Sequence, residues 1–216
     1  MLHYRELTIG EAERIAQIDA THYIQYVWRK NPATGAYERR EINWTDRELP
    51  NGFDWHLHRL QRTLTDGGSA FGCFEGDTLV GYATVEGNVF GQREKYVLLD
   101  QLFVSQAYRG RGIGRALFTL CTQKARSAGG EKLYLGAGSA ENTLRFYHRL
   151  GCVLAAEPDS ALLAEDPTTI RSPRSFPGYP LPGVGPGADP LLGRGWLQYN
   201  FRSCSDRLWL RISPGK

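Results

Sequence analysis

Apolar residues recur at two different spacings along the chain, and the spacing predicts where helices and strands lie. Apolar positions three and four residues apart, typical of helices, occur in residues 8–19, 52–68, 113–127 and 140–151. Runs of β-prone residues, typical of strands, occupy residues 3–7, 69–75, 78–87, 95–105, 132–137 and 152–157. This order of elements predicts an α/β fold, with a mixed, mostly antiparallel central sheet flanked by helices.

Local signals refine the N-terminal half of the prediction. Thr8 and Glu11 have the spacing of a capping box, which marks the start of a helix. The β-prone residues 23–28 and 37–44 flank a stretch rich in turn-forming residues. We therefore expect a hairpin between the first two helices.

The hydropathy pattern breaks after Ile170. Residues 171–195 are rich in Pro and Gly and show no periodicity, which predicts irregular structure. Basic residues also concentrate in residues 171–216, which hold seven Lys or Arg and two Asp, although the net charge of the whole chain is only +3. We therefore expect a folded domain at residues 1–170 and a Pro/Gly-rich, basic and irregular C-terminal extension at residues 171–216.

The composition is that of an ordinary globular protein. With 216 residues, 41% of them hydrophobic and 23% charged, the chain is long enough to bury one substantial core. No apolar run approaches the roughly 20 residues that span a bilayer, and the N-terminus does not combine a basic region with an apolar one. We expect a cytoplasmic protein without membrane contact.

The cysteines and histidines predict neither disulfides nor a metal site. The 4 cysteines lie far apart in the sequence, so buried thiols in a reducing compartment are the simpler interpretation. His56 and His58 lie two residues apart on a predicted helix, where side chains point about 200° apart. We therefore expect both histidines at the surface and no bound metal.

The stretch AYRGRGIGRALF, residues 107–118, contains three glycines and three arginines. It covers the end of a loop and the first residues of the helix predicted from Ile113. The first turn of a helix has unpaired N–H groups and the positive end of the helix dipole, and glycine lets a phosphate approach the backbone. A glycine-rich turn with solvated arginines explains the composition equally well. The stretch lacks the Lys-Ser/Thr pair of a Walker loop, and Arg115 replaces the third glycine of a dinucleotide fingerprint.

The segment from Arg109 to Gly114 resembles the R/Q-x-x-G-x-G/A signature of the GNAT superfamily of N-acetyltransferases, and it lies between a buried strand and a helix as in that family. A second motif is similar: Asn142 opens a helix, Tyr147 and a glycine follow, and Cys152 replaces the usual Phe. The resemblance covers residues 3–170. Residues 17–19, Gln-Ile-Asp, resemble an uncharacterised prokaryotic branch of the same superfamily.

The resemblance implies acetyl-CoA as co-substrate and no metal. In the family, the glycine loop holds the pyrophosphate on backbone N–H groups, and the preceding strand bonds the pantetheine arm and the acetyl oxygen through its backbone. The coenzyme-binding residues implied for this chain are Leu102, Phe103, Val104, Arg109, Gly110, Arg111, Gly112, Ile113, Gly114, Arg115 and Asn142. Asn142 is also suited to cap the helix that it opens.

The candidate catalytic residues are Tyr147, which the resemblance implies, and Asp100, which its position in the sequence suggests. In the family, the tyrosine protonates the leaving thiolate; a core aromatic side chain is the plain alternative for Tyr147. Asp100 lies in an apolar run, where a carboxylate is costly unless it is paired or functional. It fits three roles: to deprotonate the amine through water, to hold a cationic amine, or to form a structural hydrogen bond. Its parity with Leu102 and Val104 predicts that the three side chains share a face.

The acceptor is expected to bind between the first two helices, where the superfamily varies. Residues 22–55 combine aromatic side chains with carboxylates, which suits a cationic amine but also an exposed hairpin packed by its own aromatics. The candidate acceptor-binding residues are Tyr23, Trp28, Trp44 and Glu86. We expect direct acetyl transfer to a primary amine of a small molecule in a ternary complex. A protein or peptide amine, or a non-catalytic acyl-CoA-binding module, are the alternatives.

The family fold normally closes with a strand inserted beside the fifth strand, and this chain departs from that pattern after Ile170. Prolines interrupt the expected strand, and residues 196–201 and 206–213 are the only strand-like pieces that follow. Either the strand is lost, or the chain loops out and residues 206–213 return to fill its place, or the tail is non-native. Its basic residues are too few to predict nucleic-acid binding. The oligomeric state stays open, a homodimer included.

Overall fold

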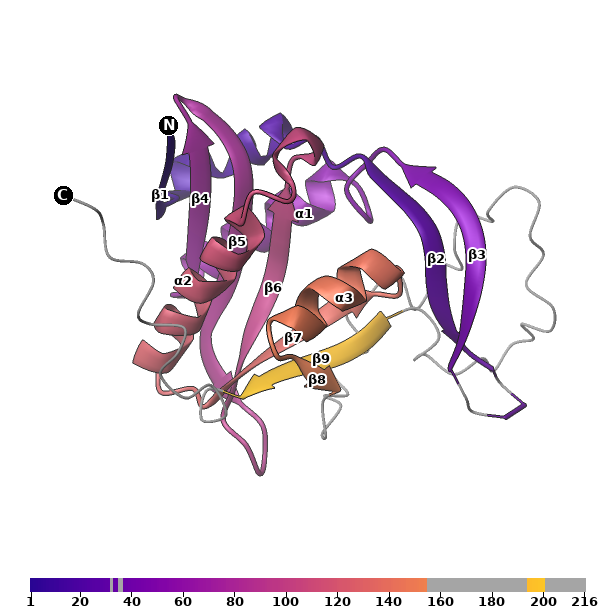
Figure 1. Cartoon of the computed structure of the whole chain (residues 1–216). Helices are drawn as coiled ribbons and strands as arrows, with labels where there is room; N and C mark the ends of the chain where they lie inside the picture. Colours follow the sequence, from indigo (N-terminus) through magenta and orange to yellow (C-terminus); the bar gives the residue numbers. More distant parts are fainter. Residues whose placement is uncertain (32, 35–36, 155–193, 201–216) are drawn as a thin grey trace.

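A computed structural model describes residues 1–31, 33–34, 37–154 and 194–200. Its main sheet is 7-stranded, in the order β1-β4-β5-β6-β7-β9-β8 (Figure 1). The strands are β1 (Leu2–Glu6), β4 (Ser69–Glu75), β5 (Thr78–Phe90), β6 (Tyr96–Val104), β7 (Lys132–Gly138), β8 (Val153–Leu154) and β9 (Arg194–Asn200). The helices are α1 (Phe53–Thr65), α2 (Ile113–Ser127), α3 (Glu141–Arg149) and the 3-10 helices η1 (Ile9–Gln17) and η2 (Gln106–Tyr108). Neighbouring strands run antiparallel except β6 and β7, so the predicted fold class is confirmed.

The predicted hairpin is present as a separate 2-stranded antiparallel sheet of β2 (His22–Lys30) and β3 (Tyr37–Asp46). It projects from the main body beside α3 (Figure 1). A backbone bridge joins Val27 to Ala140, and the Trp28 N–H donates to the Ser139 carbonyl at 2.9 Å. These contacts hold β2 at the carboxyl end of β7, next to the start of α3.

Helices cover both faces of the main sheet (Figure 1). On one face, α2 and α3 pack over the sheet, and α2 buries Ile113, Leu117 and Cys121 at the predicted helical spacing. On the other face, η1 and α1 pack around Ile15 and Leu60. Because both faces are covered, β4 and β5 are buried along most of their length and read as apolar runs rather than as an alternation.

The pairing of β6 with β5 contains a bulge at Asp100. Thr84 of β5 pairs with Gln101, but the next residue of β5 pairs with Leu99. Asp100 therefore has no partner on β5. The pairing of β6 with β7 ends at the same place, since Leu99 with Leu135 is the last parallel pair. A bulge bends its strand and increases the local twist, so β6 and β7 diverge from Asp100 onward (Figure 1).

The bulge makes the predicted direction of the Asp100 side chain wrong. Leu102 and Val104 pack against the core beneath α2 and α3, whereas Asp100 contacts Arg59 of α1 on the opposite face. The extra residue breaks the period of two, so parity counted across the bulge assigns the wrong face.

The expected closing strand of the sheet is β9, which lies between β7 and β8. Lys132 pairs with Asn200 at one end of β7, and Val153 of β8 pairs with Gln198. Of the alternatives that the sequence left open, loss of the strand and its replacement by residues 206–213 are therefore both wrong. Residues 206–213 lie outside the described part of the chain. β9 comes from the predicted extension, so that segment contributes one strand to the main sheet.

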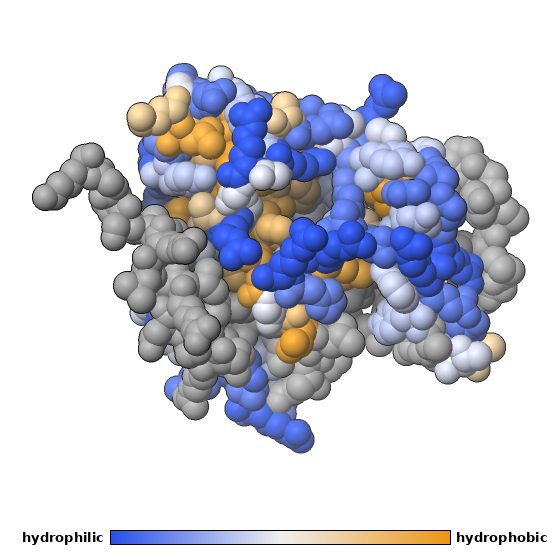
Figure 2. All heavy atoms as spheres, viewed as in Figure 1, coloured by the Kyte–Doolittle hydropathy of each residue, from blue (hydrophilic) through white to orange (hydrophobic). Residues whose placement is uncertain are grey.

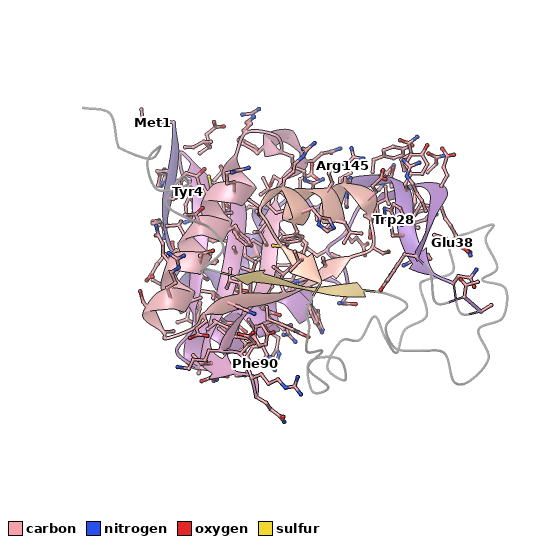
Figure 3. The ribbon with its side chains drawn as sticks, turned by 60° about the horizontal axis from the view of Figure 1, so that its bottom comes forward. Met1, Tyr4, Trp28, Glu38, Phe90 and Arg145 are labelled. Atoms are coloured by element: carbon pink, nitrogen blue, oxygen red, sulfur yellow. The ribbon has the colours of Figure 1, made fainter. Side chains whose placement is uncertain are left out.

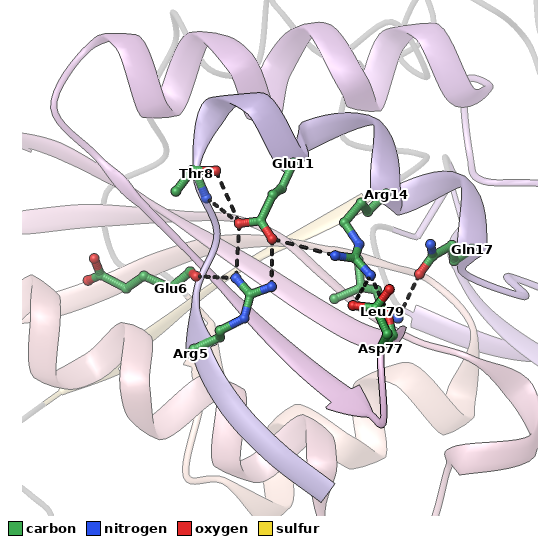
Figure 4. A network of polar contacts seen from close by, with 8 residues as sticks. All are labelled: Arg5, Glu6, Thr8, Glu11, Arg14, Gln17, Asp77 and Leu79. Atoms are coloured by element: carbon green, nitrogen blue, oxygen red, sulfur yellow. Dashed lines mark hydrogen bonds and ion pairs between the residues drawn. The ribbon is translucent and has the colours of Figure 1, made fainter.

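The predicted capping box opens η1, which is a 3-10 helix (Figure 4). The Thr8 N–H donates to Glu11 Oε2 at 3.1 Å, and Arg5 donates to both Glu11 oxygens at 2.5 and 2.9 Å. The hydrogen bonds from Arg5, which have the largest effect, and those from Thr8 lower the pKa of Glu11 to about 2. Arg14 bonds Asp77, so the network ties η1 to β1 and to the turn between β4 and β5.

His56 is buried, with 2% of its surface exposed, so its predicted surface position is wrong; His58 is exposed, as predicted. The helical position alone does not reveal that partners from two distant segments surround the imidazole of His56. Three cysteines, Cys73, Cys121 and Cys152, are free and buried. Burial raises the pKa of the Cys152 thiol to about 12. Cys204 lies outside the described residues.

Among the described residues, the helices are all too short or too polar to cross a membrane.

Candidate active site

The diverging ends of β6 and β7 leave a strand edge open. The Ser105 N–H donates to the Val80 carbonyl of β5 at 2.9 Å. Backbone groups of alternate residues in an antiparallel pair point to opposite sides. Phe103 therefore directs its N–H and C=O toward β5, whereas those of Leu102 and Val104 face the β7 side, where pairing has ended. We call this open edge, Leu102–Val104, the β6 edge; it offers backbone groups to an extended ligand.

The glycine loop, residues 109–112, leads from η2 into α2. Gly110 and Gly112 have φ of 78° and 82°, in the left-handed region that favours glycine. A Cβ built at either position meets no atom within 4 Å. The backbone conformation therefore requires these two glycines, and the space beside them is open to a ligand.

The first turn of α2 offers free donors to an anion. Gly112 is the N-cap, no side chain caps this turn, and the turn contains no acidic residue. The Ala116 N–H makes the first bond of the helix, to the Gly112 carbonyl at 3.0 Å. The N–H groups left without a helical partner belong to Ile113, Gly114 and Arg115. With the exposed Arg111 and Arg115 beside them, these donors form an anion site.

Gly114 serves a different purpose from the loop glycines. A Cβ at Gly114 would lie 3.1 Å from Cζ of Phe146 on α3. Gly114 therefore lets α2 and α3 approach closely at the end nearest the glycine loop. Figure 2 shows apolar side chains framed by polar ones in the middle of this face, where α2 and α3 lie in Figure 1.

The side chain of Arg109 is occupied by backbone carbonyls. Its Nε donates to Val104 at 2.9 Å, its Nη1 to Thr21 at 2.7 Å, and its Nη2 to Ala20 at 3.3 Å. The guanidinium thus fastens the connector between η1 and β2 to the end of the β6 edge. The positive side chains that remain for an anion are Arg111 of the loop and Arg115 of α2.

The start of α3 lies beside β2. Asn142 Nδ2 donates to the Tyr23 carbonyl at 3.3 Å, and the Asn142 side chain also bonds His22. Burial, followed by the charge of Arg109, lowers the pKa of His22. The N-cap of α3 is Ala140, so Asn142 does not cap the helix. Its side chain instead lies where β2 and α3 meet.

Tyr147 lies in the core between the two helices of its face. Only 7% of its surface is exposed, and its ring centroid is 6.5 Å from that of Phe118 on α2 and 5.0 Å from that of Phe146. The phenol ring is therefore held by packing, as a core aromatic would be. This position is compatible with both roles that the sequence left open.

Asp100 forms an ion pair with Arg59 of α1. Arg59 Nη2 donates to Oδ1 at 2.6 Å, and Nε lies 2.9 Å from Oδ2 and 3.0 Å from Oδ1. Only 8% of the Asp100 side chain and 11% of the Arg59 side chain are exposed. Both carboxylate oxygens are thus engaged by one guanidinium, which corresponds most closely to the structural role considered for Asp100.

A second polar cluster beside this pair was not predicted. Gln101 Oε1 accepts from the Tyr82 hydroxyl at 2.7 Å and lies 2.9 Å from Nδ1 of His56. Burial, then the charge of Asp100, raises the pKa of Tyr82 well above its ordinary value, so the phenol stays a donor. Sequence offers one signal for this cluster: Gln101 is polar within a buried strand.

The candidate acceptor-binding residues do not form one cluster. Tyr23 is exposed and its hydroxyl donates to Asn43 at 2.7 Å, and Glu86 of β5 pairs with Arg62 at 3.7 Å. Trp28 lies on β2 beside α3 (Figure 3), and Trp44 faces Ile24 across the hairpin. Glu38 and Glu41 have partners within the hairpin: Arg40 pairs with Glu38 on the outer strand (Figure 3), and Asn43 donates to Glu41.

Comparisons with known proteins agree with this geometry. Residues 33–152 match the acetyltransferase (GNAT) family. The fold is similar to that of nourseothricin acetyltransferase, with 19% identity, a TM-score of 0.62, and 92% and 98% of the two chains covered. A Bacillus anthracis protein assigned as a streptothricin acetyltransferase, in complex with acetyl coenzyme A, has 13% identity and a TM-score of 0.59 over 93% and 100%. PaiA N-acetyltransferase from Thermoplasma acidophilum, in complex with coenzyme A, has 11% identity and a TM-score of 0.51 over 93% and 99%.

No curated protein sequence matches this chain. The family match nevertheless spans more than half of the chain and includes the β6 edge, the glycine loop and α3. The chain belongs to the acetyltransferase (GNAT) family.

Proposed function

We propose that this acetyltransferase moves the acetyl group of acetyl-CoA directly to a primary amine of a small molecule, within a ternary complex. The observation that carries the proposal is that the β6 edge leads to the anion site of α2: Arg109 of the glycine loop bonds the carbonyl of Val104, the last residue of β6, and the loop enters α2. One extended ligand with a pyrophosphate in its middle would use both. Solved relatives that contain acetyl-CoA or coenzyme A share the fold, which supports this ligand.

The pyrophosphate would lie at the first turn of α2. There it accepts hydrogen bonds from N–H groups of residues 110–115, and Arg111 and Arg115 add positive charge. The pantetheine arm would follow the β6 edge and bond the backbone of Leu102 and the N–H of Val104, since the Val104 carbonyl accepts from Arg109. Asn142 would bond the same arm, in addition to its hydrogen bond with the Tyr23 carbonyl.

Transfer requires a neutral amine, a polarised thioester and a protonated leaving group. The amine nitrogen attacks the thioester carbonyl carbon; the C–N bond forms, the C–S bond breaks, and its electron pair stays on sulfur. The Tyr147 hydroxyl donates a proton to this thiolate. The attacking nitrogen loses one proton to water as the amide forms, and water returns a proton to the Tyr147 phenolate. Asp100 acts through position rather than as a base, because Arg59 engages both of its oxygens.

The acceptor would bind between the hairpin and the β6 edge, on the side of Trp28 and Trp44. Tyr23 points to the other face of β2 and would lie outside this site. The names of two relatives with this fold, nourseothricin and streptothricin acetyltransferase, denote small-molecule acceptors, which supports a small amine over a protein. A cytoplasmic location and the domain boundary after residue 170 stay predictions, and the oligomeric state, a homodimer included, stays open.

Calorimetric titration of the full chain with acetyl-CoA tests the proposal, with NAD and ATP as control ligands. We expect binding of acetyl-CoA alone, followed by thiol release in a screen of small amines. Gly112→Glu should abolish binding, because it puts a carboxylate and a side chain at the anion site; Gly112→Ala is its control for backbone strain. Absence of acetyl-CoA binding by the native chain would refute the proposal, and release only with peptide amines would reassign the acceptor.

A further inference from the structure

We propose that His56 and Arg59 of α1 are positioning residues for acetyl transfer: they hold the two bulge residues Asp100 and Gln101 and thereby set the β6 edge open for the acetyl-CoA arm. This inference rests on the proposed function, since it assigns that edge to the coenzyme. It concerns residues on the face of the sheet opposite to α2 and the glycine loop.

The contacts converge on the bulge from one helix face. His56 and Arg59 are three residues apart, so their side chains leave α1 on the same side. Arg59 binds both oxygens of Asp100, and the Gln101 amide bonds both the ring and the backbone carbonyl of His56. The Gln101 Nε2 to His56 carbonyl distance is 3.2 Å. Two consecutive residues of β6 are therefore attached to the same turn of α1.

β5 holds the bulge from a second direction. The Tyr82 hydroxyl donates to Gln101 Oε1 at 2.7 Å, and the Gln101 N–H donates to Thr84 Oγ1 at 3.1 Å. In a regular antiparallel ladder the N–H of Gln101 would donate to a backbone carbonyl. At the bulge it donates to the Thr84 hydroxyl instead. His56 is itself fixed, because its Nε2 lies 2.6 Å from the Pro50 carbonyl. The cluster is buried and its members bond one another, so α1 and β5 together hold the bulge.

The cost of this arrangement favours a positional role. A buried ion pair gains little stability over apolar side chains of the same volume, because both charges lose their water. Arg59 and Asp100 are nevertheless almost fully buried, at the residue where pairing of β6 with β7 ends. A β6 without the bulge would continue its parallel pairing and close the edge that Leu102 and Val104 now present.

Hydrogen–deuterium exchange with and without acetyl-CoA tests this role without a known acceptor. In the native chain, we expect acetyl-CoA to slow exchange both in the β6 segment, residues 100–104, and in the glycine-loop segment, residues 110–115. In Arg59→Met, we expect the protection of the β6 segment to be lost and that of the glycine-loop segment to remain. Arg59→Lys, which keeps the charge without the forked geometry, should restore part of the protection.

Leu64→Ala is the control for a general loss of stability. Leu64 is a partly buried residue of the same helix and packs in the core beneath η1 and α1. It should lower the melting temperature and leave protection of both segments intact. Equal protection of the β6 segment in Arg59→Met and the native chain, or loss of protection at both segments, would overturn the inference. Absence of protection in the native chain would refute the proposed function itself. If Arg59→Met does not fold, the same criteria apply to Arg59→Lys.

Discussion

The guanidinium of Arg109 donates to the backbone carbonyl of Thr21, 88 residues earlier in the chain, at 2.7 Å. The two residues join the glycine loop to the connector that leads into the hairpin. Arg109, the first residue of the glycine motif, thus binds backbone carbonyls of the protein and does not point to the anion site at the start of α2. Its neighbour Arg111, whose guanidinium carbon lies 4.9 Å from the centre of the Tyr108 ring, has no such role among the contacts described.

Arg109→Met should therefore destabilise the fold. It removes a charged donor from three carbonyls, which costs about 2 kcal/mol by comparison with other charge-assisted hydrogen bonds. Urea denaturation measures the loss. Arg111→Met is the matched control: we expect a change in stability within about 0.5 kcal/mol, but weaker acetyl-CoA binding, most clearly at low salt. Equal stability of the native protein and Arg109→Met would contradict the assignment.

The close approach of Gly114 to Phe146 predicts a steric rescue. Gly114→Ala places a methyl group 3.1 Å from the Phe146 ring and should destabilise the protein by about 1–2 kcal/mol, in the range of overpacked cores. The second substitution Phe146→Leu makes room for the methyl group. In a double-mutant cycle by thermal melts, the loss in the double variant should be smaller than the sum of the single losses. Additive losses would show that the two residues do not press on each other.

Tyr147→Phe separates chemistry from packing. The substitution keeps the ring between Phe118 and Phe146 and removes only the hydroxyl. We expect the turnover number to fall by about 100-fold, the scale of a lost general acid, while the affinity for acetyl-CoA and the melting temperature change little. Thiol-release kinetics and calorimetry provide the two readouts. Full activity of the variant would assign proton donation elsewhere and leave Tyr147 as a core residue.

Glu11→Gln should alter the response of the protein to acid. The pKa of Glu11 lies below its ordinary value in the folded state, so its ion pair stabilises the protein above about pH 4.5. That contribution is lost as the pH falls toward about 2, where the folded carboxylate becomes protonated. Glutamine preserves the capping box and removes the charge. Urea melts should show a loss of about 0.5 kcal/mol at pH 7 that shrinks at pH 3; a loss independent of pH would contradict this account.

Truncation after Ile170 removes β9 and should weaken the sheet. β7 then loses its antiparallel neighbour and β8 loses the strand to which it pairs. A loss of about 3 kcal/mol would lower the melting temperature by about 10 °C in a protein of this size. Truncation after Asn200 keeps β9 and serves as the control. If both truncated chains melt at the same temperature, β9 contributes no stability.

The sequence predicted the parts of the site that local chemistry determines. Gly110 and Gly112 adopt left-handed conformations that few other residues accept, and the apolar spacing from Ile113 places α2 directly after them. These signals lie within a few residues of the structure they specify. The glycine loop and the helix could therefore be recognised without any knowledge of the remaining fold.

The contacts made over long distances in sequence could not be predicted. The face of Asp100 depends on a bulge of one inserted residue; the neighbouring polar residues Asp100 and Gln101 interrupt the apolar run but do not by themselves reveal a bulge. The burial of His56 depends on Gln101, 45 residues away. For the closing strand, residues 196–201 and 206–213 carry similar strand signals, and only the pairing of β9 with Lys132–Gly138 selects the first segment. Such choices are made by tertiary packing rather than by local propensity.

The position of β9 also affects how fast the protein can reach its native state. Lys132 of β7 pairs with Asn200, so a long stretch of chain must close into a loop before these hydrogen bonds form, and contacts of this kind slow folding. β8 is synthesised earlier and lacks its pairing partner until β9 is in place. During that interval the edge of β7 is exposed to strands of other chains, which is the usual start of aggregation. The yield of native protein will then depend on the rate at which β9 inserts into the sheet relative to the rate at which unpaired chains associate.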